Sequence, residues 1–150
     1  MPQSLANNLL HLVFSTKNRE PYLRRDLRPE LHAYMAVVLA NINCPVLMMN
    51  SVADHVHLLF SLHRTVALSS AVEEVKKSSS KWLKTKSPDL ANFAWQGGYG
   101  AFSVSQSNIA AVRSYIGRQE EHHRTVTFKD ELTAFFRKNG VAFDERYLWD

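Results

Sequence analysis

Apolar residues recur along the chain with two different spacings, and the order of these spacings predicts the fold. Strand-like alternation or short apolar runs occupy residues 7–15, 44–52, 55–62 and 99–104. Helical spacing of apolar residues occupies residues 26–41, a segment from Leu68 to a stop at Pro88, residues 107–121 and residues 129–138. The predicted order is therefore βαββαβ with further helices after it.

This order is typical of one fold class. A βαββαβ chain forms an α+β sandwich of the ferredoxin-like type, with a four-stranded antiparallel sheet and two helices on one face. Only Ala53 and Asp54 separate the second and third strands, so these strands should form an antiparallel hairpin. We expect helix 26–41, capped by Asp26, and the helix from Leu68 to cover one face of the sheet. The opposite face is expected to be open, with the C-terminal helices appended.

Two histidines stand out in the third strand. Strand alternation sends His55 and His57 to one face, while Val56 and Leu58 point towards the helices. Neighbouring imidazoles on one face can both aim a ring nitrogen at the same divalent ion. An arbitrary pair of this kind is more often an ordinary half-buried polar pair. Alone, the pattern is only a weak indication of a metal site.

Tyr115 and Gln119 are four residues apart and so share one face of the predicted helix 107–121. From the shoulder of its apolar stripe, the tyrosine could reach the histidine face, and the amide oxygen could join the histidines. Tyrosine suits attack on a phosphodiester because a phosphotyrosine conserves the bond energy needed for rejoining. The alternative interpretation is that Tyr115 only covers the core with its ring.

Composition narrows the class of protein. A chain of 150 residues, 45% hydrophobic and 21% charged, matches a single globular domain over residues 1–150 rather than a disordered or fibrous protein. No apolar run is long enough for a membrane span and the start does not resemble a signal peptide, so we expect a cytoplasmic protein without membrane association. Cys44 is the only cysteine, so a metal must use histidine, carboxylate or amide ligands.

The formal net charge of +4 permits phosphate binding but does not require it. Two basic clusters provide the candidates for contacts with nucleic acid: Arg24, Arg25, Lys76, Lys77, Lys81 and Lys84. The alternative is that these clusters are solvated surfaces. The other five histidines are interpreted as structural or surface residues: His11, His32, His63, His122 and His123.

Segments 54–60 and 113–120 resemble the two signature segments of the HUH single-tyrosine transposases, the small enzymes of IS200-like insertion sequences and their REP-associated relatives. Segments 95–104 and 144–150 extend the resemblance. It implies that His55, His57 and Gln119 bind Mg²⁺ or Mn²⁺ and that Tyr115 is the nucleophile. The ferredoxin-like fold of that family agrees with the predicted order of elements.

The resemblance also implies a function. The expected activity is that of a transposase that cleaves and rejoins single-stranded DNA through a 5′-phosphotyrosine intermediate, acting on ends that contain hairpins. A homodimer is expected, in which the Tyr115 helix of one subunit could serve the histidine face of the other. Two alternatives stay open: a non-catalytic domain that binds single-stranded nucleic acid, and a small metal-dependent phosphohydrolase.

Overall fold

The structure is a computed structural model that describes residues 2–149, without the side chain of Tyr147. Asp150, the last residue of the predicted motif 144–150, lies outside the described residues. The strands are β1 (Asn8–Ser15), β2 (Val46–Ser51), β3 (His55–Leu62) and β4 (Gly100–Val104). The α-helices are α1 (Arg28–Ala40), α2 (Leu68–Lys84), α3 (Ile109–Gly117), α4 (Gln119–His122), α5 (Phe128–Lys138) and α6 (Glu145–Leu148). Short 3-10 turns are η1 (Lys17–Arg19), η2 (Pro88–Leu90) and η3 (Gln106–Asn108).

The strands form one antiparallel sheet in the order β2-β3-β1-β4. This order confirms the predicted ferredoxin-like α+β fold, including the hairpin of β2 and β3. In the register of the sheet, His57 lies opposite Val13 of β1 and Asn50 of β2, and His55 lies opposite Ser15. Directly opposed residues share a face, so both histidines look out on the same side of the sheet.

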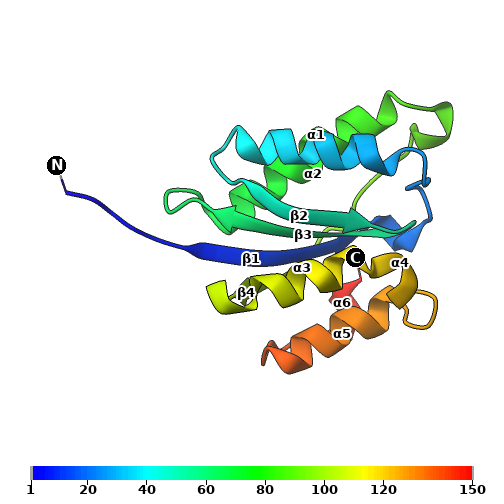
Figure 1. The fold of residues 1–150 in the computed structure, drawn as a ribbon. Helices are drawn as coiled ribbons and strands as arrows, with labels where there is room; N and C mark the ends of the chain where they lie inside the picture. Colours follow the sequence, from blue (N-terminus) through cyan, green and yellow to red (C-terminus); the bar gives the residue numbers. More distant parts are fainter. Residues whose placement is uncertain (1, 150) are drawn as a thin grey trace.

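Helices α1 and α2 cover one face of the sheet, as predicted (Figure 1). The apolar side chains that meet there include Phe14 and Phe60 from the sheet, Met35 from α1 and Val75 from α2. Each large side chain that is fully buried contributes roughly 1.5–3 kcal/mol to folding. Among residues 2–149, no helix combines the length and apolarity needed to cross a membrane.

One detail of α1 differs from the prediction. The helix begins at Arg28 after Leu27 as N-cap residue, with a proline in its first turn, and no side chain caps it. Asp26 therefore does not cap the helix. Its carboxylate lies 3.7 Å from the guanidinium of Arg24 instead. Proline in the first turn has no backbone N–H, so one fewer donor at this helix end needs an acceptor.

The expectation of an open second face is wrong, because the C-terminal helices cover it (Figure 1). Val13 and Phe102 of the sheet pack against Phe128, Leu132 and Phe136 of α5. Leu132 approaches so closely that a Cβ at Gly100 would lie 2.8 Å from its Cδ1, closer than carbon atoms pack. The apolar stripe of α5 must be buried somewhere, and this face of the sheet is where it packs. His55 and His57 are consequently 0% exposed.

The single helix predicted over residues 107–121 is broken at Arg118, whose backbone has φ −102° and ψ 22°. Asn50 of β2 stabilises the break, because its Nδ2 donates to the carbonyl oxygens of Ile116 at 2.9 Å and Gly117 at 3.3 Å. Tyr115 and Gln119 therefore belong to different helices. The short α4 then leads to His123, whose ring lies 4.3 Å from that of His55 between centroids.

Candidate functional site

Four side chains that can bind a metal ion meet beneath the covered face of the sheet. His55 and His57 come from β3, His123 follows α4, and Glu131 lies in the first turn of α5. One ligand atom from each of these residues lies within 4.8 Å of the other three. The chain thus brings four donor atoms from three separate segments to one point.

The spacing of these atoms fits a bound ion. Glu131 Oε1 lies 2.9 Å from His57 Nε2, 3.1 Å from His123 Nε2 and 3.4 Å from His55 Nε2. The Nε2 atoms of His55 and His123 are 2.9 Å apart. An ion bonded at about 2.0–2.2 Å to nitrogen and oxygen keeps its ligand atoms about 3.0–3.5 Å apart. This group of side chains could therefore hold a metal ion.

The second nitrogen of each ring is also held in place. His55 Nδ1 lies 2.7 Å from Asp54 Oδ1, and His123 Nδ1 lies 2.5 Å from the carbonyl oxygen of Val126. Because these oxygens accept hydrogen bonds, each Nδ1 donates and each Nε2 faces the cluster. His57 Nδ1 pairs with His11 Nε2 of β1 at 2.8 Å. Outer contacts of this kind orient metal-binding histidines in proteins.

Glu131 supplies a buried negative charge at the centre of the cluster. Glu131 is only 3% exposed. Burial opposes ionisation, but hydrogen bonds with His123, His55 and His57 outweigh it and hold the pKa of Glu131 far below its usual range. The carboxylate is therefore ionised and depends on its imidazole partners for compensation.

The surroundings shift the pKa values of the imidazoles in different directions. Burial lowers the pKa of His57 to about 4 and that of His11 to about 3, so both are neutral near pH 7. Burial also disfavours charge on His55, but hydrogen bonds to Asp54 and Glu131 raise its pKa above the ordinary value. The charged form of His55 is therefore favoured by the two carboxylates that it contacts. A bound cation would supply a positive charge in place of that proton.

Tyr115 joins the same cluster through Glu131. Its hydroxyl donates a hydrogen bond to Glu131 Oε2, and His122 Nε2 lies 3.3 Å away. Its ring lies 5.9 Å from that of His57 between centroids. Burial and the neighbouring carboxylate raise the pKa of Tyr115 above its ordinary value, which keeps the phenol protonated. The candidate nucleophile and the histidine pair thus meet within one chain.

Gln119 is fully buried beside Tyr115. Its Nε2 donates to the carbonyl oxygen of Tyr115 at 3.3 Å, while its Oε1 has no hydrogen-bond partner among the described residues. A buried amide oxygen without a donor is unfavourable unless another electrophile satisfies it. This orphaned oxygen fits the predicted ligand role of Gln119, which stays a prediction.

Sequence reasoning missed three members of the site. His123 and His11 were predicted to be structural or surface residues, and no role was predicted for Glu131. One signal for Glu131 was present, because it lies three residues after Phe128 and next to Leu132 on the apolar stripe of α5. A carboxylate in such a position is buried only when it has partners.

The predicted contacts with nucleic acid are not tested by the fold. Lys76 has structural partners, since its Nζ donates to the carbonyl oxygens of Gln96 and Gly98, and burial lowers the pKa of Lys76 to about 8. The other three lysines, Lys77, Lys81 and Lys84, are exposed on α2, across the sheet from the histidines. Arg25 lies 2.6 Å from Glu120 of α4, and Arg24 lies near Asp26.

Comparisons with known proteins agree on one family. The family model described as "Transposase IS200 like" matches residues 4–119, a range that includes the predicted site residues and ends before His123 and Glu131. The ISDra2 transposase TnpA of Deinococcus radiodurans is 27% identical over 116 residues, which cover 74% of this chain and 83% of that protein.

Two solved structures share the fold. One, assigned to a transposase of Deinococcus radiodurans, has a TM-score of 0.62 at 20% identity and covers 79% of this chain and 98% of that chain. The other, a REP-associated tyrosine transposase bound to a REP hairpin, has a TM-score of 0.62 at 16% identity and covers 84% of this chain and 74% of that chain.

The cluster predicts stabilisation by a divalent cation. Mn²⁺ at roughly one hundred times its Kd should stabilise the protein by about 2.7 kcal/mol and raise Tm by roughly 5–10 °C. The double variant His55→Ala with His57→Ala should show no rise in a thermal melt. His63→Ala, a histidine bonded to Thr65 outside the cluster, is the matched control and should keep the full rise. Equal stabilisation of the double variant would exclude a metal site at this position.

Proposed function

The chain belongs to the IS200-like transposase family, and from this premise we propose that it cleaves and rejoins single-stranded DNA through Tyr115. The observation that carries the proposal is the shared carboxylate of Glu131, which contacts the Tyr115 hydroxyl with one oxygen and the histidine cluster with the other. A nucleophile and a cation site thus lie on either side of one group.

The proposed reaction is a transesterification. The Tyr115 oxygen forms a bond to phosphorus, the bond from phosphorus to the 3′ oxygen breaks, the phenol loses its proton and the 3′ oxygen gains one. The product is a 5′-phosphotyrosine with a free 3′-hydroxyl, and a second 3′-hydroxyl can reverse the step on another end. The bond energy is conserved, so no external energy source is needed.

Glu131 holds Tyr115 as a neutral phenol in the arrangement described, because a carboxylate beside a phenol disfavours phenolate. A divalent cation bound at the histidines would polarise a phosphate oxygen and favour loss of the phenol proton. We propose that His55 and His57 are its fixed ligands and that Gln119 supplies an oxygen. Two imidazole ligands are a poor match for Mg²⁺, which prefers oxygen ligands in near-ideal octahedral geometry, so Mn²⁺ is the ion used in the tests.

The proposed substrate is single-stranded DNA with hairpin-containing ends. The REP-associated relative in complex with a REP hairpin supports this choice.

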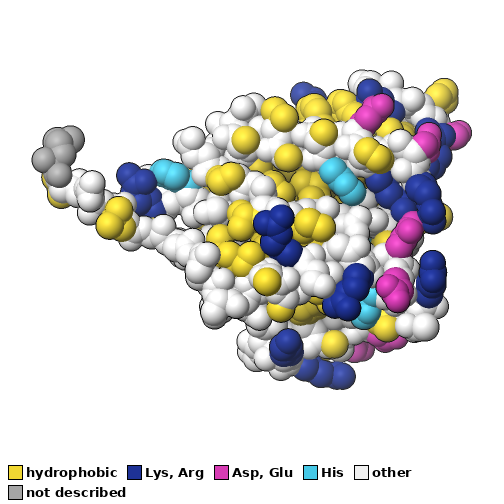
Figure 2. Space-filling view, viewed as in Figure 1, with side chains coloured by type: hydrophobic (Ala, Val, Ile, Leu, Met, Phe, Trp, Pro, Cys, Tyr) yellow, Lys and Arg dark blue, Asp and Glu magenta, His cyan; other side chains and the backbone are white. Residues whose placement is uncertain are grey.

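The proposed assembly is a homodimer. Strand β2 is an edge of the sheet, and its residues 46–50 are only partly buried. Figure 2 shows apolar side chains gathered across the middle of the side of the molecule that it displays. An exposed edge can pair with a second copy. A monomer mass in light scattering would contradict this assembly.

The covalent step is tested with Tyr115→Phe, which keeps the ring and its packing but removes the attacking oxygen. With labelled single-stranded ends of its own locus and Mn²⁺, the variant should bind DNA as tightly as the unmodified protein and form no covalent adduct in denaturing electrophoresis. Tyr34→Phe, on the far layer where Tyr34 stacks on Trp82, should form the adduct normally.

Other outcomes of this assay separate the alternatives. DNA binding without an adduct in any variant indicates a non-catalytic binder. Phosphate products released without an attached end indicate a phosphohydrolase. Either result would overturn the proposed transfer reaction.

The oxygen ligand is tested by comparing Gln119→Ala with Glu131→Gln in titrations with Mn²⁺. If Gln119 is a ligand, its loss should weaken Mn²⁺ binding by about tenfold or more. Gln106→Ala, on the exposed η3, is the matched control and should bind normally. Unchanged affinity in Gln119→Ala together with a large loss in Glu131→Gln would assign the oxygen to Glu131 and reject the proposed role of Gln119.

A further inference from the structure

A cavity of about 720 Å³ opens beside the histidine cluster. His123 and Asp54, which orients His55, lie in its wall. Four cationic side chains also line it: Arg19, Arg28, Arg124 and Lys129. The two acidic residues of the wall, Asp54 and Glu120, contact His55 and Arg28 respectively. The remaining cations give the cavity an excess of positive charge next to the proposed reaction site.

Arg19 is placed in the cavity by an unusual turn. Asn18 and Arg19 both have positive φ, 55° and 58°, in the left-handed region that residues other than glycine rarely adopt. The turn is anchored to the site, because the Thr16 amide donates to the carbonyl oxygen of Asp54 at 2.8 Å. Strained backbone of this kind persists where surrounding contacts enforce it, and it is concentrated at functional sites.

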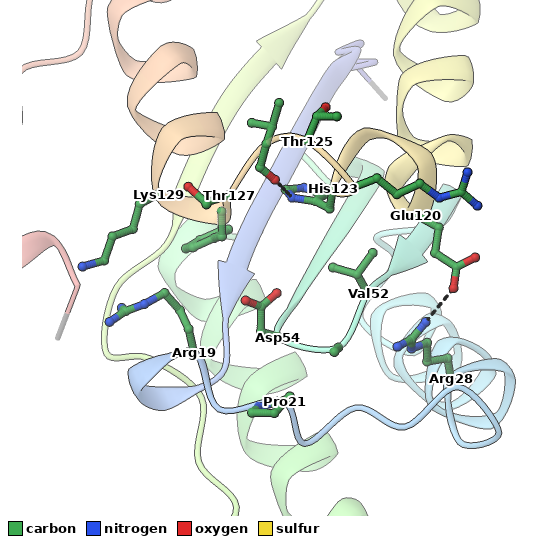
Figure 3. A pocket seen from close by; sticks show the side chains of 14 residues that line it. Arg19, Pro21, Arg28, Val52, Asp54, Glu120, His123, Thr125, Thr127 and Lys129 are labelled. Atoms are coloured by element: carbon green, nitrogen blue, oxygen red, sulfur yellow. Dashed lines mark hydrogen bonds and ion pairs between the residues drawn. The ribbon is translucent and has the colours of Figure 1, made fainter.

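Arg19 and Lys129 lie against the same aromatic ring. Arg19 Cζ is 5.9 Å and Lys129 Nζ is 5.3 Å from the centroid of the Trp149 indole. Figure 3 shows the two side chains extending in the same direction from η1 and from the start of α5. The indole is also linked to the cluster, since the Phe128 ring lies 6.1 Å from Trp149 and 4.7 Å from His55 between centroids.

No ion pair joins Arg19 or Lys129 to a carboxylate of residues 2–149. Nη1 of Arg19 is buried and has no hydrogen-bond partner among residues 2–149. Two like charges beside one ring repel each other, and a buried guanidinium nitrogen without an acceptor is unfavourable. A phosphate between them would satisfy both requirements, because guanidinium and ammonium groups are the usual donors to phosphate oxygens.

We propose that Arg19 and Lys129 form a phosphate subsite that holds the backbone of the single strand where it enters the site. This proposal rests on the proposed function, since it takes the anion to be a phosphodiester of the DNA on which Tyr115 acts. The strand then reaches the histidines along the cavity, on the opposite side of the sheet from the exposed lysines of α2. Electrostatic contacts of this kind position a strand without reading its sequence.

The test measures binding of a short mixed-sequence single-stranded oligonucleotide by fluorescence anisotropy over a series of salt concentrations. Every protein carries Tyr115→Phe and the buffer contains EDTA, so neither cleavage nor metal enters the result. Arg19→Gln and Lys129→Gln should each weaken binding by about tenfold, because a charged hydrogen bond to phosphate is lost. Each should also lower the slope of log affinity against log salt by about one.

Arg137→Gln removes an exposed cation at the other end of α5 and serves as the matched control. It should bind within about twofold of the parent protein. Thermal melts check folding. If Arg19→Gln fails to fold, the DNA affinities of Arg19→Lys and of the exposed Lys129→Gln are compared with that of the parent protein instead.

Affinities of Arg19→Gln and Lys129→Gln within twofold of the parent, or an equal loss in Arg137→Gln, would overturn the subsite. Protection of the fold by inorganic phosphate without any effect of the substitutions on DNA binding would also overturn it. The binding assay needs neither the Tyr115 hydroxyl nor a cation. Its result can therefore be interpreted even if the proposed cleavage reaction is disproved.

Discussion

The carboxylate of Glu131 is the contact on which the site depends. It joins α5 to the histidines of β3 and to the tyrosine of α3. A buried carboxylate is tolerated only with compensating partners, so the imidazoles and the phenol must converge on it. Helix α5 therefore both covers the second face of the sheet and completes the site, because it provides the apolar stripe and the carboxylate.

The elements that depend on local patterns were predicted well. The four strands, helices α1 and α2, and the shared face of His55 and His57 follow from periodicity in short segments. The covered second face was not predicted, because it depends on how Leu132 of α5 fits over Gly100 of β4, which no local pattern encodes. The break at Arg118 was missed for the same reason, since Asn50, which stabilises it, belongs to a strand far away in the sequence.

The site itself was half predictable. The histidine pair and Tyr115 lie in segments that resemble the family signatures, and these segments fall inside the matched residues 4–119. His123 and Glu131 lie beyond that range and reach the cluster through tertiary packing alone. The orphaned oxygen of Gln119 and the carboxylate of Glu131 are two candidate oxygen ligands for a cation at the histidine pair. The titration of Gln119→Ala and Glu131→Gln with Mn²⁺ decides which oxygen binds the cation.

The central claim is that the histidine cluster and the tyrosine of one chain form a single site. It is tested most directly by mixing two inactive proteins, Tyr115→Phe and His57→Ala, with different tags under conditions that exchange subunits. If each chain uses its own Tyr115, every site in the mixture carries a lesion, and the mixture should stay as inactive in DNA cleavage as its components. Cleavage restored in purified heterodimers would show that the tyrosine serves the histidines of the partner and would contradict the account.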